Sequence, residues 1–447
     1  MNPELLRNVW HELTWRRVIA MPLILGVILW VPSSFDGVTE TAGFLFIVFT
    51  VFWGTRQAAD AVASEVADST WDWQRLSTLS AWQLTWGKLV GATLFSWYGA
   101  LICLGVRFVA LVPDHGVVAM VHVTLYLAAG ALMGQAVAFL LGLQAVRLRG
   151  HRTRSGTLMS QMLGILTGLV IISSGSFLPG GLLEWLDALK LAPVVGWYGL
   201  TFPSTTVATV SLALYLGWAL LGAQRLMMRE LSYRTRPWTW PIFVLFTCFY
   251  IAGFEPAEPT IIGDVMRPDL AARLVVATGV AAVLTYASLF WDDKDPVVFR
   301  RLIRLARARD WSTFAAHTPT WFVSFAITAV LAILLLLVGG GGAMGGVTVW
   351  AAVIGGLLFM LRDIGINLYF WLSPSPARAN LITLIVLGLL YWVGPGFTEF
   401  DPDTMFLFIP FAPGHPVSVI CAGLAQVGFV ILLLVRRWRA RFVLANA

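Results

Sequence analysis

Long apolar runs alternate with short polar segments along the whole chain. A membrane-spanning helix needs roughly 20 predominantly apolar residues, and most of the runs have about this length. The pattern therefore predicts an all-α polytopic membrane protein with twelve spans. They cover residues 18–33, 42–60, 88–112, 118–146, 156–176, 202–224, 238–254, 271–291, 320–338, 347–370, 380–395 and 416–435.

The composition agrees with this pattern and excludes a soluble domain. Of the 447 residues, 58% are hydrophobic and only 12% are charged, whereas soluble domains carry about 25% charged residues. The three cysteines, Cys103, Cys248 and Cys421, all fall inside apolar runs. We interpret them as small buried hydrophobic residues, not as metal ligands.

The basic residues follow the positive-inside rule. With twelve spans, 26 of the 30 Lys and Arg fall in segments on one side of the membrane. This asymmetry predicts that both termini are cytoplasmic. It also explains the net charge of +6 without a nucleic-acid partner, because the arginines lie in short loops next to the bilayer. We expect a multi-pass protein of the plasma membrane, the inner membrane of a bacterium.

The two halves of the chain show signs of a duplication. A four-residue pattern recurs at an offset of 235 residues, as Thr78, Ala81, Thr85 and Trp86 and again as Thr313, Ala316, Thr320 and Trp321. Each copy opens the third predicted span of its half, and both halves start on the same side. We therefore predict a parallel repeat with six spans in residues 18–228 and six in residues 229–447.

The segment before the first span has its own pattern. Between Pro3 and Arg17, the apolar residues share one helical face, whereas charged and amide residues take the other. The apolar set is Leu5, Leu6, Val9, Trp10 and Leu13. Such a pattern is typical of a helix that lies in the membrane interface. We expect an amphipathic elbow helix within residues 1–17.

A polar island, Glu65 to Lys88, separates the second and third predicted spans. It resembles the first cytoplasmic loop of the type-2 ABC transporter permeases, in which an acidic helix end leads into a short loop helix and a Gly-Lys pair opens the next span. The residues that fit are Glu65, Asp68, Thr70, Asp72, Leu79, Ser80, Trp82, Gly87 and Lys88. Ser69 stands where the family usually has Gly, and Thr78 where it usually has Pro.

The resemblance implies a permease subunit, by analogy an exporter, that couples to separate ATPase subunits, two in number. ATP and Mg²⁺ would be bound by those partners. The acids of the loop would pair with basic groups on an ATPase, and its apolar side chains would fill a surface groove there. The coupling residues implied are Glu65, Asp68, Thr70, Asp72, Arg75, Leu76, Leu79, Trp82, Gly87 and Lys88.

The second half has a loop at the corresponding position, Asp292 to Trp321. It lacks the Gly-Lys pair and is rich in arginine. Two interpretations stay open: a second, degenerate coupling loop, or a segment that binds anionic lipid head groups. Its candidate residues are Arg300, Arg301, Arg304, Arg307 and Trp311.

Candidate chemistry within the chain is sparse. No GxxxxGK[ST] motif occurs, and no two histidines have a metal-ligand spacing. We therefore expect no enzyme activity, cofactor or metal in this chain. An ion-coupled carrier normally needs ionisable groups deep in the membrane, and we place all 24 Asp and Glu in loops or at span ends, with Asp60 and Asp363 closest to entering a span. A carrier and a non-transporting membrane scaffold stay as alternatives.

Overall fold

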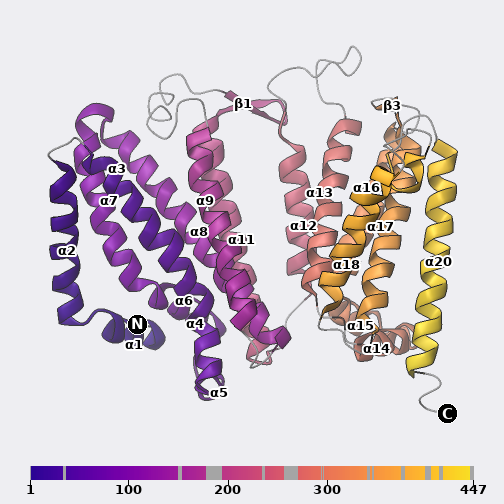
Figure 1. Cartoon of the computed structure of the whole chain (residues 1–447), viewed down its shortest axis with the longest axis horizontal. Coiled ribbons are helices and arrows are strands. Elements are labelled where there is room, and N and C mark those ends of the chain that lie inside the picture. The colour runs from indigo at the N-terminus through magenta and orange to yellow at the C-terminus, as the bar shows by residue number, and fades with distance from the viewer. Residues whose placement is uncertain are drawn as a thin grey trace. The chain divides into compact units, whose positions relative to one another are not determined.

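The computed structural model of the chain describes residues 2–33, 37–149, 154–177, 194–233, 237–255, 270–292, 294, 296–339, 343–344, 347–373, 378–397, 404–411 and 416–442. The chain separates into two compact units. One contains residues 1–195 and 200–235, and the other contains residues 196–199 and 236–447. Each is a bundle of helices (Figure 1), as the hydropathy pattern predicts.

The first unit begins with α1 (Pro3–Glu12) and α2 (Trp15–Ser33) and then turns back along one long helical segment. That segment consists of α3 (Val38–Ile47), the π-helical turn η1 (Val48–Gly54) and α4 (Thr55–Ala67). The remaining elements are α5 (Trp71–Arg75), α6 (Ala81–Ala92), α7 (Leu94–His115), α8 (Val117–Arg149), α9 (Arg154–Phe177), strands β1 (Val194–Trp197) and β2 (Leu200–Pro203), and α11 (Ser204–Glu230). The last two residues of β1, Gly196 and Trp197, belong to the second unit.

The second unit has a similar sequence of elements. It starts with α12 (Thr239–Ala252) and α13 (Leu270–Trp291), followed by the two loop helices α14 (Pro296–Arg307) and α15 (Trp311–His317). The rest are α16 (Thr320–Gly339), strands β3 (Ala343–Met344) and β4 (Val347–Thr348), α17 (Val349–Trp371), α18 (Ala379–Gly388), the π-helical turn η3 (Leu389–Val393), α19 (Gly394–Phe397), the short η4 (Met405–Leu407) and α20 (Pro416–Phe442).

Within the described residues, nine helical segments are long and apolar enough to cross a membrane, and α1 with α2 would make a tenth if the bent pair counts as one span. The apolar stretches Thr157–Ile172 and Thr239–Ala252 are helical but shorter. All twelve predicted spans thus fall on helix. The all-α multi-pass architecture is confirmed, whereas the count of twelve and the side of the termini stay predictions.

Helix α1 lies in the segment for which an elbow helix is predicted, and its place in the membrane interface stays a prediction. Asn2 caps it, since its side chain accepts a hydrogen bond from the Glu4 backbone N–H at 3.1 Å, and Pro3 occupies the first helical position, where no N–H is needed. Its axis bends by 61° from that of α2. Trp10 on its apolar face is 77% exposed, which is the expected arrangement for a side chain that anchors in a membrane interface.

Small residues allow helices α8 and α9 to pack closely. A Cβ added to Gly134 would lie 2.8 Å from the carbonyl oxygen of Gly164, and one added to Gly164 would lie 2.5 Å from the Cβ of Ala138. Helix pairs in membranes associate through such close backbone contacts. In the first unit α8 also packs against α4 and α11, and in the second unit α17 packs against α16, α18 and α20.

Candidate functional site

The polar island of the first unit starts at a defined helix end. The N–H of Thr70 donates to the carbonyl of Glu65 at 2.9 Å, and the N–H of Ser69 donates to that of Val66 at 3.2 Å. These two bonds form the motif in which a left-handed residue closes a helix, and Ser69 has φ 58°. Ser69 therefore adopts the backbone conformation for which glycine is favoured, so the turn forms without the glycine of the family pattern.

Helix α5 follows this turn and lies at one end of the first unit (Figure 1). Its first residue, Trp71, is buried at 4% exposure, whereas Trp73 is 79% exposed and Leu76, just after the helix, is 81% exposed. The loop then reaches Ser80, which caps α6 through a capping box with Gln83. The structure thus presents two large apolar side chains outward from a short, well-anchored helix.

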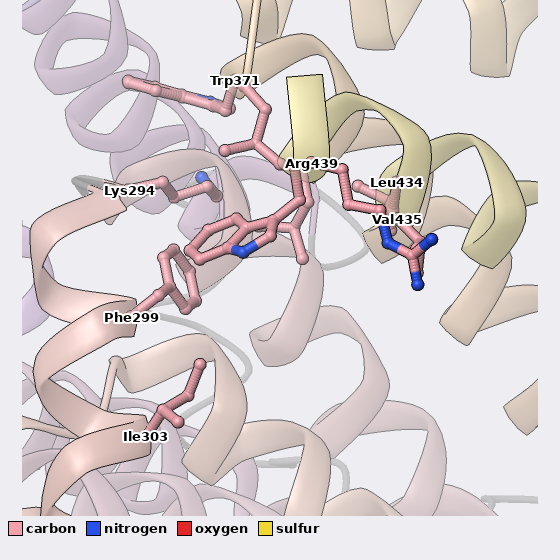
Figure 2. Close-up of a pocket in the computed structure, with 10 residues that line it drawn as sticks. Lys294, Phe299, Ile303, Trp371, Leu434, Val435 and Arg439 are labelled. Carbon is pink, nitrogen blue, oxygen red and sulfur yellow. The ribbon is translucent and has the colours of Figure 1, made fainter. Parts of the chain in front are cut away.

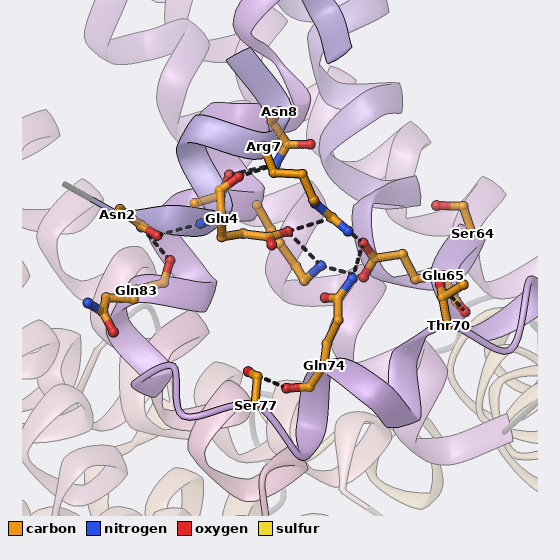
Figure 3. Close-up of polar contacts among 12 residues, drawn as sticks. Asn2, Glu4, Arg7, Asn8, Ser64, Glu65, Thr70, Gln74, Ser77 and Gln83 are labelled. Atoms are coloured by element: carbon orange, nitrogen blue, oxygen red, sulfur yellow. Dashed lines mark hydrogen bonds and ion pairs between the residues drawn. The ribbon is translucent and has the colours of Figure 1, made fainter. Parts of the chain in front are cut away.

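A group of four charged side chains fixes the base of α5. We call Glu4, Arg7, Glu65 and Lys88 the elbow cluster (Figure 3). Lys88 Nζ donates to Glu4 Oε1 at 3.1 Å and to Glu65 Oε2. Arg7 Nη2 donates to Glu4 Oε1 and to Glu65 Oε1, both at 2.8 Å. With two acids and two bases the cluster is neutral, which lowers the cost of burying its charges.

Neighbouring residues complete this arrangement. Gln74 Nε2 donates to Glu65 Oε1 at 2.7 Å, and Lys88 Nζ lies 5.2 Å from the centre of the Trp71 ring, a cation–π contact. Both Trp71 and Gln74 belong to α5. The cluster therefore ties α5, the end of α4, the elbow helix α1 and the start of the next span together.

Gly87 explains how α1 approaches α6 so closely. A Cβ at this position would lie 2.8 Å from both Cβ and Cγ of Glu4. Asn8 Nδ2 also donates to the Gly87 carbonyl at 3.3 Å, and Asn2 Nδ2 donates to the Gln83 carbonyl at 2.6 Å. In the Gly-Lys pair of this loop, the glycine makes room for the elbow helix and the lysine neutralises the acids on both sides.

The structure divides the predicted coupling residues into two groups. Glu65, Gly87 and Lys88 are internal, and the Glu65 carboxylate is taken up by Arg7, Gln74 and Lys88. Leu79 is half-buried. The others are exposed: Asp68, Thr70, Asp72, Arg75, Leu76 and Trp82. Sequence reasoning missed Trp73 and the partners of Lys88, although a lysine at the start of an apolar run is a signal that a carboxylate must lie nearby.

The second loop repeats the backbone turn but not the cluster. Arg309 has φ 57°, and the N–H of Asp310 donates to the Leu305 carbonyl at 3.1 Å, as at the end of α4. Asp310 then caps α15 by accepting from the Thr313 N–H at 3.1 Å, and hydrogen bonds from Thr313 and Ser312 lower the pKa of Asp310. The candidate residues of this loop are all exposed: Arg300, Arg301, Arg304, Arg307 and Trp311.

The second unit contains a feature that contradicts our placement of the acids. Asp363 lies inside α17, eight residues or about 12 Å before its last residue, Trp371. Asp363 and its neighbour Arg362 are buried, at 0% and 2% exposure. Hydropathy alone placed them near a junction because two adjacent charges and two following prolines, Pro374 and Pro376, resemble a loop.

Residues from three other elements surround this pair, and we call Tyr286, Arg362, Asp363, Tyr391 and Gln426 the span cluster. Asp363 Oδ2 accepts from the hydroxyls of Tyr286 and Tyr391, each at 2.7 Å, and Oδ1 accepts from Arg362 Nε at 2.8 Å. Arg362 Nη1 donates to Gln426 Oε1 at 2.6 Å. The pair is thus neutral and hydrogen-bonded, as a buried ion pair must be.

In the part of the chain that the structure describes, no three His, Cys, Asp or Glu side chains are grouped closely enough to hold a metal ion. The fold and these clusters define a multi-pass helical membrane protein. No protein family, curated protein or solved structure matches the chain.

Proposed function

We propose that this chain is the permease subunit of an ATP-driven transporter of the type-2 ABC class, an exporter in a plasma membrane. Two separate ATPase subunits would bind ATP and Mg²⁺. In this proposal the chain has twelve spans in two parallel halves, with both termini cytoplasmic. The similar order of helices supports the repeat: α8 packs against α9 and α11 in the first unit, as α17 packs against α18 and α20 in the second.

The observation that carries the proposal is that α5 and the residue after it expose apolar side chains, while charged residues inside the unit anchor the helix. Trp73 and Leu76 are exposed at 79% and 81%, a suitable pair of apolar anchors for a partner surface. Glu65 and Lys88 act as positioning residues that hold α5 against α4 and α6. A push from the ATPase on α5 would then reach both adjoining spans as a rigid-body movement.

The test is purification of the C-terminally tagged protein in mild detergent, with identification of co-purifying proteins and an ATPase assay. We expect a stoichiometric ATPase subunit. Joint replacement of Trp73 and Leu76 by Ser should release it, since both anchors are lost. Trp311→Ser, at the 61% exposed position that opens α15, is the matched control and should release less. Trp82→Ser should likewise uncouple ATP hydrolysis from transport more strongly than Arg304→Gln does.

Purification of the chain alone, without ATPase activity, would refute this proposal. A result in which Trp311→Ser releases as much partner as the α5 variant would instead refute the unequal roles of the two loops.

The span cluster favours a second candidate function, an ion-coupled carrier. A carboxylate inside a membrane helix is a functional-site hypothesis by default, and Asp363 lies inside α17 among side chains of α13, η3 and α20. In proteoliposomes without an ATPase, a carrier would dissipate an imposed pH gradient, and Asp363→Asn would abolish this flux. A protein that leaves the gradient intact, with and without Asp363, would exclude proton coupling.

A further inference from the structure

An apolar pocket of about 330 Å³ lies in the second unit, between the loop helix α14 and the ends of α17 and α20 (Figure 2). Its size is at the lower end of the roughly 300–1,000 Å³ of small-molecule sites. The walls are formed mainly by Phe299 and Ile303 of α14, Trp371 of α17, and Leu434, Trp438 and Arg439 of α20. The lining is almost entirely hydrocarbon and aromatic.

Helix α14 has two sharply different faces. Phe299 and Ile303 line the pocket and Leu302 is buried at 8% exposure. No acidic residue occurs between Val297 and Arg309, and the side opposite Phe299 and Ile303 carries Arg301 and Arg304 beside the exposed Val297. Arg301, Arg304 and Arg307 are exposed. An amphipathic helix with a basic polar face is the form that binds an anionic membrane surface.

The two basic residues of the pocket, Lys294 and Arg439, differ in whether hydrogen bonds within the protein already occupy them. Lys294 Nζ donates to the Asp292 carbonyl at 3.2 Å and to the Leu289 carbonyl, so it caps the end of α13. Arg439 is exposed, and among the described residues it forms no hydrogen bond or ion pair. Arg307 lies one helical turn beyond Ile303. Arg307 and Arg439 therefore provide uncommitted positive charge near an apolar pocket.

We propose that this pocket binds an acyl chain of an anionic phospholipid of the surrounding bilayer, with Arg307 and Arg439 holding its phosphate. The charge is complementary, and the pocket lies where the membrane helices α17 and α20 end. On α14, Phe299 lines the pocket and Leu302 is buried, whereas Val297 and Ile303 are 64% and 47% exposed, less than the 79% and 81% of Trp73 and Leu76 on α5. The proposal assigns different partners to the two loops and does not depend on the transport activity.

The test is a titration of the purified full chain in mild detergent with phosphatidylglycerol and with phosphatidylcholine of the same acyl chains, read out as bound lipid by native mass spectrometry. We expect phosphatidylglycerol to bind at least tenfold more tightly. Each basic residue near an anionic surface contributes about a fivefold factor in affinity. The double variant R307Q/R439Q should therefore weaken phosphatidylglycerol binding by about 25-fold and bring it close to phosphatidylcholine.

Two sets of control variants distinguish binding of the head group from binding of the acyl chain, and both from a loss of folding. R301Q removes a charge from the opposite side of α14 and should leave the preference unchanged. Leu434→Trp and, from the other wall, Ile303→Trp should reduce binding of both lipids by filling the pocket, with an unchanged melting temperature as the check on folding. Equal binding of the two lipids, or an R301Q effect as large as that of R307Q/R439Q, would overturn the head-group assignment. Unchanged binding in both filled and folded variants would overturn the pocket assignment.

Discussion

The elbow cluster and the span cluster use the same pairing of carboxylate and cation at different depths. In the elbow cluster the Arg7 side chain is 53% exposed and that of Glu65 is 16% exposed, so water reaches its edge. In the span cluster the side chains of Arg362 and Asp363 are 3% and 0% exposed. Both clusters join separate helical elements, but water can reach the edge of the first, whereas the ion pair of the second is fully enclosed. Charge pairing alone therefore does not distinguish a structural tie from a functional site.

The first unit shows that a span can hold a polar group without charge. Gln135 of α8 accepts from Trp97 Nε1 at 2.9 Å and donates to the Thr50 carbonyl at 3.0 Å. Thr50 belongs to the π-helical turn η1, as Tyr391 of the span cluster belongs to η3. The charges of the span cluster, Arg362 and Asp363, belong to α17 and meet η3 through the Tyr391 side chain, so they do not satisfy the backbone of the irregular turn as Gln135 does at η1. This difference is the reason to look for a function in the span cluster.

The largest expected effect is the removal of one charge from the span cluster. Asp363→Leu would leave Arg362 buried without its counter-ion and should destabilise the protein by about 3–5 kcal/mol. The double variant Arg362→Met/Asp363→Leu should recover most of this loss, because no unpaired charge remains. Thermal unfolding in detergent measures both. A double variant as unstable as the single one would show that the pair contributes more than mutual neutralisation.

A smaller effect is expected in the elbow cluster. Lys88→Met leaves Glu4 and Glu65 with Arg7 as their shared cation, and water can enter at the edge, so we expect a loss of about 1–3 kcal/mol. Faster hydrogen exchange of the α1 amides would report the loosened elbow. Arg16→Met in α2 is the control for the loss of a basic residue. Equal exchange in the two variants would contradict the role of Lys88 as a tie between helices.

Gly87→Ala tests the close approach of α1 without changing any charge. The new methyl group would press on Glu4 and should cost about 1–3 kcal/mol, as overpacking does, again seen in α1 exchange. Gly105→Ala is the matched control, since a Cβ there meets nothing within 4 Å. If Gly87→Ala behaves like Gly105→Ala, the elbow has room to adjust and the glycine is not needed for contact.

The smallest effect concerns the turn that the two loops share. Ser69→Gly and Arg309→Gly should each stabilise the protein by less than about 1 kcal/mol, because glycine adopts a left-handed backbone without steric cost. Asp68→Gly is the control, since Asp68 has an ordinary φ of −83° and glycine should destabilise there. A rise in melting temperature for only one loop would indicate that the two turns are not equivalent in solution.

Much of the fold could be predicted, because hydropathy and length largely determine a membrane helix. The elbow α1 and the loop helix α5 also lie where amphipathic spacing and the resemblance placed them. Contacts between distant residues could not be predicted in the same way. Nothing local to Glu4 indicates Lys88, 84 residues away. Asp363 was misplaced because hydropathy counts each charged residue separately. Arg362 neutralises Asp363, and burying the neutral pair in a span costs less free energy than the sum for two separate charges.

The long separation between Glu4 and Lys88 also has a consequence for biogenesis. At ribosomal rates, about 4–17 s pass between the synthesis of residues 84 positions apart. During this interval the elbow helix lacks its lysine partner, and of the elbow cluster only the contacts of Arg7 with Glu4 and Glu65 can form. The elbow cluster is therefore completed only when the segment that contains Lys88 has been made, so the order of synthesis sets the order in which α1, α4 and α6 are tied together.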